Sequence, residues 1–203
     1  TNDSLTDKKI YEQAGKILRE GGLVAFPTET VYGLGADALD EEASAKIYAA
    51  KGRPSDNPLI VHIADIEALY ELSCEVPDKA LKLADKFWPG PLTMILKKSD
   101  VVPDSITGGL GTVAIRMPSH KVAAELIRTS GVYIAAPSAN TSGKPSPTRA
   151  SHVIKDLSGK IDMIIEDDTV DIGVESTIID LSEEVPTILR PGYITKEMFE
   201  EVI

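Results

Sequence analysis

The sequence predicts an α/β fold built on a mixed β-sheet. Short apolar runs alternate with segments of helical periodicity along the whole chain, the pattern of interleaved strands and helices. Some apolar runs follow one another with no helix between them, so part of the sheet must be antiparallel. The 203 residues, 42% hydrophobic and 26% charged, have the balance of a globular domain large enough to bury a core.

The first third of the chain predicts helix, strand, helix and strand in that order. The first helix has one apolar face and stops at Gly21 and Gly22. The second helix has Asp40 as its N-cap, acidic residues in its first turn, and Gly52 at its C-terminal exit. In this part we expect helices at 5–22 and 40–52, and strands at 23–28 and 58–64.

The rest of the chain also alternates between predicted helices and strands, and two of these helices begin at a capping residue. Ser119 is expected to cap one helix, and Thr195 is expected to cap the last one. The expected helices are 64–73, 77–90, 119–131, 149–159 and 196–203. The expected strands are 91–98, 112–118, 132–140, 162–168, 176–181 and 186–192.

Charge and cysteine content limit the function classes. With Cys74 as the only cysteine, neither an intramolecular disulfide nor a cysteine-based zinc site can form, which suits a reducing compartment. No apolar run approaches the ~20 residues of a membrane span, and the N-terminus is polar, so we expect a cytoplasmic protein without membrane contact. A net charge of −11 argues against strong general affinity for nucleic acid.

The sequence contains incomplete versions of two nucleotide-binding motifs, and its histidines lack the spacing of metal ligands. "GLGADA" matches a dinucleotide fingerprint, but "ETVY" separates it from the preceding strand. "SANTSGKP" ends like a phosphate-binding loop, but Ser138 and Pro145 stand where a glycine and a hydroxyl residue are needed. The three histidines have no metal-ligand spacing, so no metal site is expected.

Two polar stretches resist a purely structural interpretation. "FPTETVYGLGAD" crowds polar residues into a turn after an apolar strand, a common ligand position; the alternative is a purely structural polar turn in which Gly33 and Gly35 have positive φ. "AAKGRPSDNPLIVHI" carries Lys51 and Arg53. If that segment is extended, both cations point the same way toward a polyphosphate; the alternative is a solvated charged loop.

Other polar residues interrupt or follow apolar strands. Arg116 lies inside "VAIRMP" and needs an anionic partner, which is either an internal acid or a ligand. His62 lies on a strand and is either a packed residue or a ligand contact. The loop "APSANTSGKPSPT" offers hydroxyl and amide donors but no strong base, which favours holding a nucleotide over ester hydrolysis.

These stretches together resemble the YrdC family of threonylcarbamoyl-AMP synthases. The motifs occur in the family's order from about Ile10 to Ile194: "PTETVYGLGADA", "KGRPSDNPLIVHI", "FWPGPLT", "VAIRMP", "APSANTSGKPSPT", "GVESTIIDL" and "ILRPG". The resemblance implies a twisted mixed sheet with flanking helices and a deep concave pocket, in one catalytic domain spanning 1–203. The motifs are most similar to those of a longer subgroup that adds a linker and a second domain.

The resemblance also implies an adenylyl-transfer reaction. L-Threonine, bicarbonate and ATP would give threonylcarbamoyl-AMP and pyrophosphate, with magnesium bound through the ATP phosphates. A TsaD-type transferase complex would then use the product to modify tRNA. Residues implied for L-threonine are Thr30, His62, Arg116, Ala136 and Ser176; those implied for ATP are Lys51, Arg53, Asn57, Thr112, Ser138, Asn140, Ser146 and Arg190.

The implied chemistry explains the residue types. A carbamate and a triphosphate must meet without repelling one another, which requires converging cations and catalysis by positioning. Lys51, Arg53 and Arg116 are the expected catalytic residues. On this interpretation, Lys51→Ala or Arg53→Ala should nearly abolish adenylate formation and leave the fold intact.

Two other functions stay open from the sequence. One is a module that binds tRNA or double-stranded RNA without making an adenylate, which the acidic charge disfavours unless basic residues gather on one face. The other is a carbamoyl-transfer domain of the hydrogenase-maturation type, although the Cys-rich zinc segments expected there do not occur in this sequence.

Overall fold

A computed structural model describes residues 3–167 and 170–203. Its strands form one mixed sheet in the order β7-β1-β2-β6-β3-β5-β4-β8-β9. The strands are β1 (Val24–Pro27), β2 (Tyr32–Asp37), β3 (Ile60–His62), β4 (Leu92–Lys97), β5 (Thr112–Arg116), β6 (Ile134–Ala135), β7 (Met163–Ile164), β8 (Thr177–Asp180) and β9 (Thr187–Arg190). The pairs β1–β7, β3–β5 and β4–β8 are parallel, and the other neighbours are antiparallel. The predicted mixed sheet is therefore confirmed.

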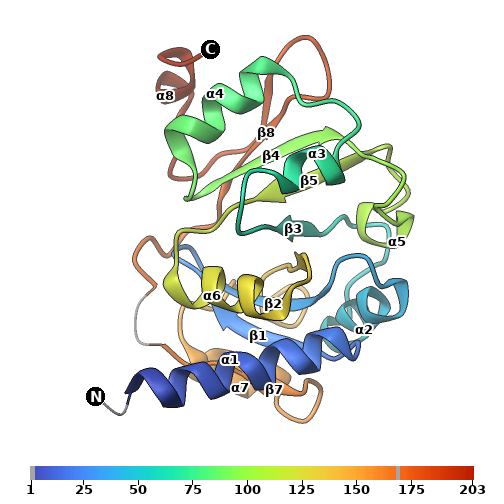
Figure 1. Ribbon diagram of the computed structural model, residues 1–203, viewed down its shortest axis with the longest axis vertical. Helices are drawn as coiled ribbons and strands as arrows, with labels where there is room; N and C mark the ends of the chain where they lie inside the picture. Colours follow the sequence, from blue (N-terminus) through green and yellow to red (C-terminus); the bar gives the residue numbers. More distant parts are fainter. Residues whose placement is uncertain (1–2, 168–169) are drawn as a thin grey trace.

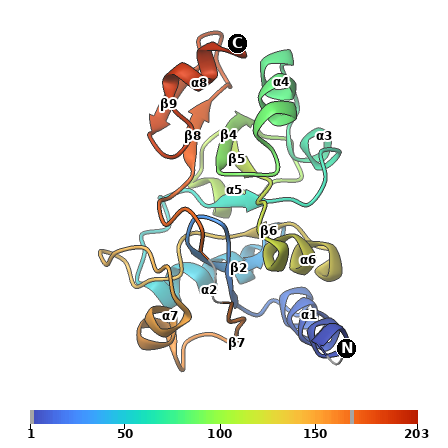
Figure 2. The ribbon, with the colours of Figure 1, turned by 90° about the vertical axis from the view of Figure 1, so that its left-hand side faces the viewer.

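Helices cover this sheet along its length (Figures 1 and 2). They are α1 (Asp3–Arg19), α2 (Glu41–Lys51), α3 (Ala68–Leu72), α4 (Asp78–Phe87), α5 (Asp104–Thr107), α6 (Lys121–Ser130), α7 (Ala150–Leu157) and α8 (Lys196–Glu200). Figure 2 shows α1 and α6 together on one side of β2, where Leu18 and Leu126 share a buried cluster with Phe26. None of the helices in the described ranges combines the length and apolar character needed to cross a bilayer.

The predicted capping residues of α2 and α8 are confirmed. The Asp40 carboxylate accepts from the backbone N–H groups of Glu42 and Ala43, Gly52 ends α2 in the left-handed conformation, and Thr195 caps α8. The expected Ser119 cap of α6 is wrong. His120 is the N-cap, and its side chain accepts from the N–H of Val122.

The main error concerns the segment predicted as a polar turn. Residues 28–31 do turn, but Tyr32–Asp37 forms β2, antiparallel to β1. The alternative that Gly33 and Gly35 have positive φ is also wrong. At Gly35 a Cβ would lie 2.6 Å from Cγ2 of Ile134, so glycine is required there by close packing.

Other expected elements are shorter than predicted. The helix expected at 64–73 is reduced to α3, where the Asp65 side chain accepts from the N–H of Ala68. The strands expected at 132–140 and 162–168 are reduced to β6 and β7, and position 168 lies outside the described residues. The short helix α5 was not predicted.

Candidate active site

A cavity of about 280 Å³ lies against one face of the central sheet. Its floor is built by the two-residue period of neighbouring strands. The lining residues on β3, β5 and β4 alternate with fully buried apolar ones, and the register sets His62 beside Arg116 and Arg116 beside Thr93. The turn between β1 and β2 and residues 136–138 complete the wall. The strands thus place polar side chains from distant motifs on one surface.

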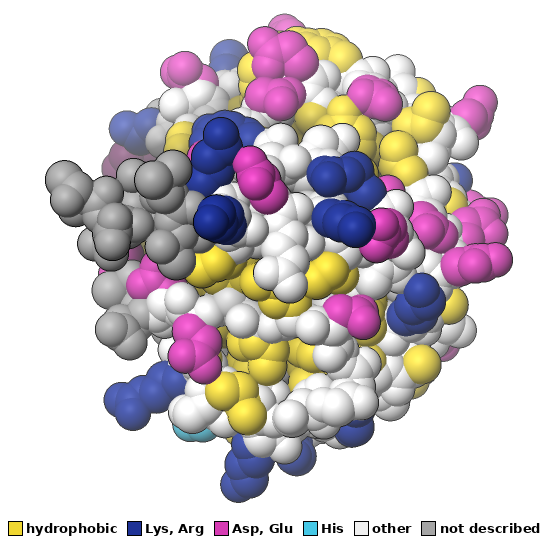
Figure 3. All heavy atoms as spheres, turned by 60° about the horizontal axis from the view of Figure 1, so that its bottom comes forward, with side chains coloured by type: hydrophobic (Ala, Val, Ile, Leu, Met, Phe, Trp, Pro, Cys, Tyr) yellow, Lys and Arg dark blue, Asp and Glu magenta, His cyan; other side chains and the backbone are white. Residues whose placement is uncertain are grey.

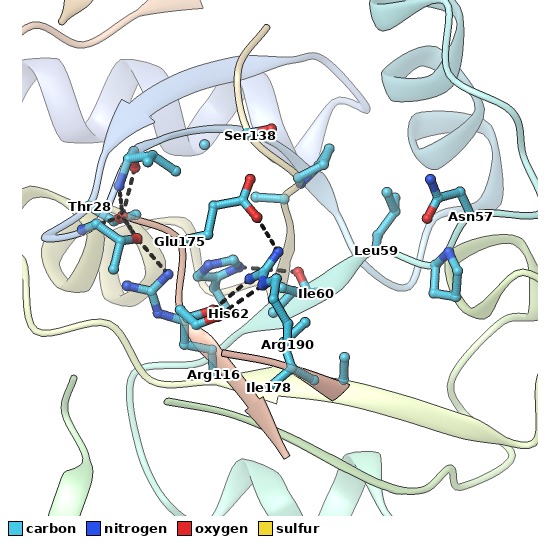
Figure 4. Close-up of a pocket in the computed structure, with 18 of the residues that line it drawn as sticks. Thr28, Asn57, Leu59, Ile60, His62, Arg116, Ser138, Glu175, Ile178 and Arg190 are labelled. Atoms are coloured by element: carbon cyan, nitrogen blue, oxygen red, sulfur yellow. Dashed lines mark hydrogen bonds and ion pairs between the residues drawn. The ribbon is translucent and has the colours of Figure 1, made fainter. Parts of the chain in front are cut away.

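Most of the predicted site residues line this cavity (Figure 4). They are Thr30, Arg53, Asn57, His62, Arg116, Ala136, Ser138, Ser176 and Arg190. Figure 4 shows Arg116 at one side and Asn57 at the other, with Glu175 and Arg190 between them. The predicted residues that are not among the lining are Lys51, Thr112, Asn140 and Ser146.

Four buried residues form what we call the inner cluster: Glu29, Thr30, His62 and Arg116. Arg116 donates to Oε1 of Glu29 at 2.6 Å and to the hydroxyl of Thr30 at 3.0 Å. Its Nε is buried and finds no hydrogen-bond partner within the described part of the chain. The predicted need for an anionic partner is therefore met internally by Glu29.

Burial and ion pairing set the protonation states of the inner cluster. Burial by itself would raise the pKa of Glu29, but the charge and hydrogen bond of Arg116 outweigh it and the pKa lies below its usual value. Burial, and secondarily the charge of Arg116, lowers the pKa of His62 to about 3. His62 is therefore a neutral imidazole, and its Nδ1 lies 3.1 Å from the carbonyl oxygen of Ile60.

Four other residues, which are less buried than the inner cluster, form what we call the outer cluster: Arg53, Asn57, Glu175 and Arg190. Arg190 pairs with Glu175, and Nε of Arg190 donates to the carbonyl of Ser176 at 3.0 Å. Burial lowers the pKa of Arg190, Glu175 opposes this, and the charges of Arg116 and Arg53 lower the pKa further. Three guanidinium groups therefore converge on this cavity, where an anion would be attracted.

Lys51 is placed differently from the sequence-based interpretation. It is the last residue of α2, is 1% exposed, and its Nζ donates to the backbone carbonyls of Ser138 and Asn140. The expectation of an extended segment in which Lys51 and Arg53 point the same way is wrong, because the helix continues through Lys51 and ends at Gly52 in the left-handed conformation. Lys51 holds the loop that begins at Ser138.

The other three predicted residues, Asn140, Ser146 and Thr112, lie outside the cavity lining. The Asn140 side-chain amide donates to the carbonyls of Thr141 and Lys144, which closes the loop on itself. Ser146 donates to Glu175 at 2.6 Å, so it reaches the cavity through that carboxylate. Thr112 begins β5 and pairs with Lys97.

Sequence reasoning missed two carboxylates and one hydroxyl. Glu29 and Glu175 stand inside the quoted motifs "PTETVYGLGADA" and "GVESTIIDL", each next to a predicted ligand residue. Their role could have been suspected because buried or clustered arginines need counter-charges. Thr93, whose hydroxyl lies 2.7 Å from that of Ser176, gave no comparable signal.

Comparison with known proteins shows which family this chain belongs to. The family model Sua5/YciO/YrdC, described as "Telomere recombination", matches residues 16–192. The chain belongs to the Sua5/YciO/YrdC family. It is 59% identical over 201 residues to the threonylcarbamoyl-AMP synthase of Pyrococcus abyssi and 56% identical over 204 residues to that of Bacillus subtilis. These alignments cover 99% and 100% of this chain but 59% of each relative, so the chain spans about three-fifths of their length.

Solved structures of family members agree with the fold. The crystal structure of P. abyssi Sua5 complexed with L-threonine matches with a TM-score of 0.93 and 60% identity, covering 95% of this chain and 57% of that one. Escherichia coli YciO matches with a TM-score of 0.83 and 26% identity, covering 94% and 93%. The twisted mixed sheet with flanking helices and a concave pocket, implied by the resemblance, is therefore confirmed.

Proposed function

We propose that this chain is a threonylcarbamoyl-AMP synthase, a nucleotidyltransferase that uses L-threonine, bicarbonate and ATP. The observation that carries the proposal is the convergence of Arg53, Arg116 and Arg190 on one cavity. The close similarity to a protein crystallised with L-threonine supports it. On this proposal residues 1–203 act as one catalytic domain.

The inner cluster would bind L-threonine. The guanidinium of Arg116 lines the cavity and would donate to the substrate carboxylate, and Thr30 and Ser176 offer hydroxyl groups for the polar parts of the amino acid. Neutral His62 and Ala136 line the same region without adding charge. A buried polar partner left without its substrate hydroxyl is costly, so valine should be rejected more strongly than serine, which lacks one methyl group.

The reaction needs two steps that balance without a covalent enzyme intermediate. The threonine amine and bicarbonate form a carbamate and release water. A carbamate oxygen then attacks the α-phosphorus of ATP, and the bond to the bridging oxygen of pyrophosphate breaks. Arg53 and Arg190 would attract the triphosphate, with Asn57 and Ser138 as neutral donors, so that catalysis comes from positioning and charge stabilisation.

Lys51 and Asn140 would contribute by shaping the loop 138–144, since both are bonded to its backbone. Thr112 and Ser146 remain proposed ATP contacts from the resemblance. The described residues provide no group of three acidic, histidine or cysteine side chains that could hold a metal ion. Magnesium would therefore accompany ATP through its phosphates and water.

The product would be consumed in the cytoplasm by a TsaD-type transferase complex that modifies tRNA. Direct tRNA or double-stranded RNA binding is the alternative function. On the face shown in Figure 3, basic and acidic side chains are interspersed and form no continuous basic stripe. With the net charge of −11, this favours the enzyme over the binding module.

A pyrophosphate-release assay with ATP and bicarbonate tests the proposal. We expect release with L-threonine, weaker release with L-serine, and background release with L-valine or no amino acid. Arg53→Ala is the matched loss-of-function variant, because Arg53 lines the cavity and is only half buried. Release that does not depend on threonine, or that survives in Arg53→Ala, contradicts the proposal.

A further inference from the structure

The carboxylate of Glu175 lies in a cavity that otherwise suits anions. Among the cavity-lining residues in the described ranges, Glu175 is the only Asp or Glu. A carboxylate at this position repels a phosphate group and lowers the affinity of the cavity for nucleotide. We therefore ask how Glu175 affects nucleotide binding.

Each oxygen of Glu175 is engaged by a residue that the resemblance implies for ATP. Oε1 accepts from the hydroxyl of Ser146 at 2.6 Å, and Oε2 pairs with the guanidinium of Arg190 (Figure 4). Carboxylate and phosphate oxygens accept from the same donors with similar geometry. Glu175 and a phosphate group therefore compete for Ser146 and Arg190.

Arg190 does not depend on Glu175 for its position. Its Nε and Nη2 donate to the carbonyl and the hydroxyl of Ser176 at 3.0 and 3.1 Å. The hydroxyl of Ser176 is itself held by buried Thr93 at 2.7 Å. Removing the charge of Glu175 should therefore leave the Arg190 guanidinium aimed into the cavity.

The ion pair between Glu175 and Arg190 is also easy to break. The two side chains are 37% and 33% exposed, in contrast to 5% for both members of the Glu29–Arg116 pair. Partly exposed pairs are screened by solvent and contribute little to stability. An incoming phosphate can replace this carboxylate, whereas it cannot replace Glu29.

We propose that Glu175 sets the affinity of the cavity for nucleotide by acting as an internal substitute for a phosphate group. This inference rests on the proposed function and adds a residue to it. A phosphate of ATP displaces the Glu175 carboxylate from Arg190 and Ser146, and the carboxylate takes these donors back when the phosphate leaves. Glu175 therefore weakens nucleotide binding and favours release.

Isothermal titration calorimetry with ATP tests the competition directly. In Glu175→Gln, which keeps the side-chain shape and removes the charge, the Kd for ATP should fall about two- to fivefold. The Kd for ATP should also fall in Glu175→Ala, because Arg190 stays bonded to Ser176 in that variant. Glu75→Gln is the control, since Glu75 pairs with Lys97 at 3.0 Å and does not line the cavity.

The outcomes separate this inference from the proposed function. A Kd that is unchanged or higher in both Glu175 variants, while the unaltered chain releases pyrophosphate, overturns only the role of Glu175. ATP binding without threonine-dependent pyrophosphate release overturns the proposed function. In that case the Kd for ATP of the Glu175 variants can still be compared with that of the unaltered chain, so the role of Glu175 is tested separately. A lower Kd in Glu75→Gln would mean that net charge, and not competition at Arg190, is responsible.

Discussion

The inner and outer clusters of the cavity contain the same kind of ion pair in different surroundings. The Arg116–Glu29 pair is 5% exposed on both sides, whereas the Arg190–Glu175 pair is about one-third exposed. In the inner cluster each charge depends on the other, because a buried charge without a partner is costly. In the outer cluster solvent can replace either partner. One part of the cavity is therefore fixed by folding, and the other can exchange its partners for a ligand.

Removing one partner of the buried pair should have the largest effect on stability. Glu29→Ala leaves the Arg116 charge buried without compensation and should lower the free energy of unfolding by about 3–5 kcal/mol. Urea denaturation measures the change. Glu175→Ala, the equivalent truncation in the outer cluster, should cost less than about 1 kcal/mol. Equal losses in the two variants would remove the distinction between the clusters.

Lys51 is a buried cation bonded to the backbone at Ser138 and Asn140, and it should behave as part of the folded framework. Lys51→Met leaves the carbonyls of Ser138 and Asn140 without their donor and should cost about 1–3 kcal/mol in urea denaturation. Lys46→Met is the control, because exposed Lys46 on the same helix donates to the carbonyl of Gly21. A loss no larger than that of Lys46→Met would contradict the framework role.

The inner cluster should also make stability depend on pH through His62. Its pKa is about 3 in the folded chain and about 6.5 when unfolded, so below pH 6.5 only the unfolded state takes up the proton. The free energy of unfolding should then fall by about 2 kcal/mol between pH 6.5 and 5, above the range in which Glu29 titrates. We expect His62→Gln to lack this decrease in thermal or urea denaturation.

The control for this pH dependence is His152→Gln. His152 is exposed on α7 and does not line the cavity, so its replacement should leave the decrease between pH 6.5 and 5 intact. If His62→Gln loses as much stability on acidification as the unaltered chain, His62 does not carry a depressed pKa.

A similarly small effect on stability is expected for Arg53 in the outer cluster. Arg53→Ala should change the free energy of unfolding by no more than about 1 kcal/mol, because within the described residues the Arg53 guanidinium makes a single hydrogen bond, to the carbonyl of Pro58. On the proposed function, the same variant should lose most pyrophosphate release. A stability loss as large as that of Lys51→Met would mean that both cations are structural.

The sequence determined the fold class, the helix caps at Asp40 and Thr195, and the polar character of cavity-lining residues such as His62 and Arg116. These features follow from local rules, namely apolar periodicity, capping chemistry and polar residues that interrupt apolar strands. The family motifs added the grouping of these residues into one site.

Only the tertiary structure decided which charges face one another. Lys51 and Arg53 are two residues apart, yet the first is buried under the loop at Ser138 and the second lines the cavity. Glu29 pairs with Arg116 and Glu175 pairs with Arg190, although the partners are 87 and 15 residues apart in the chain. The strand register and the turn of the chain at Gly52 fix these pairings, and neither is contained in the local pattern of residues.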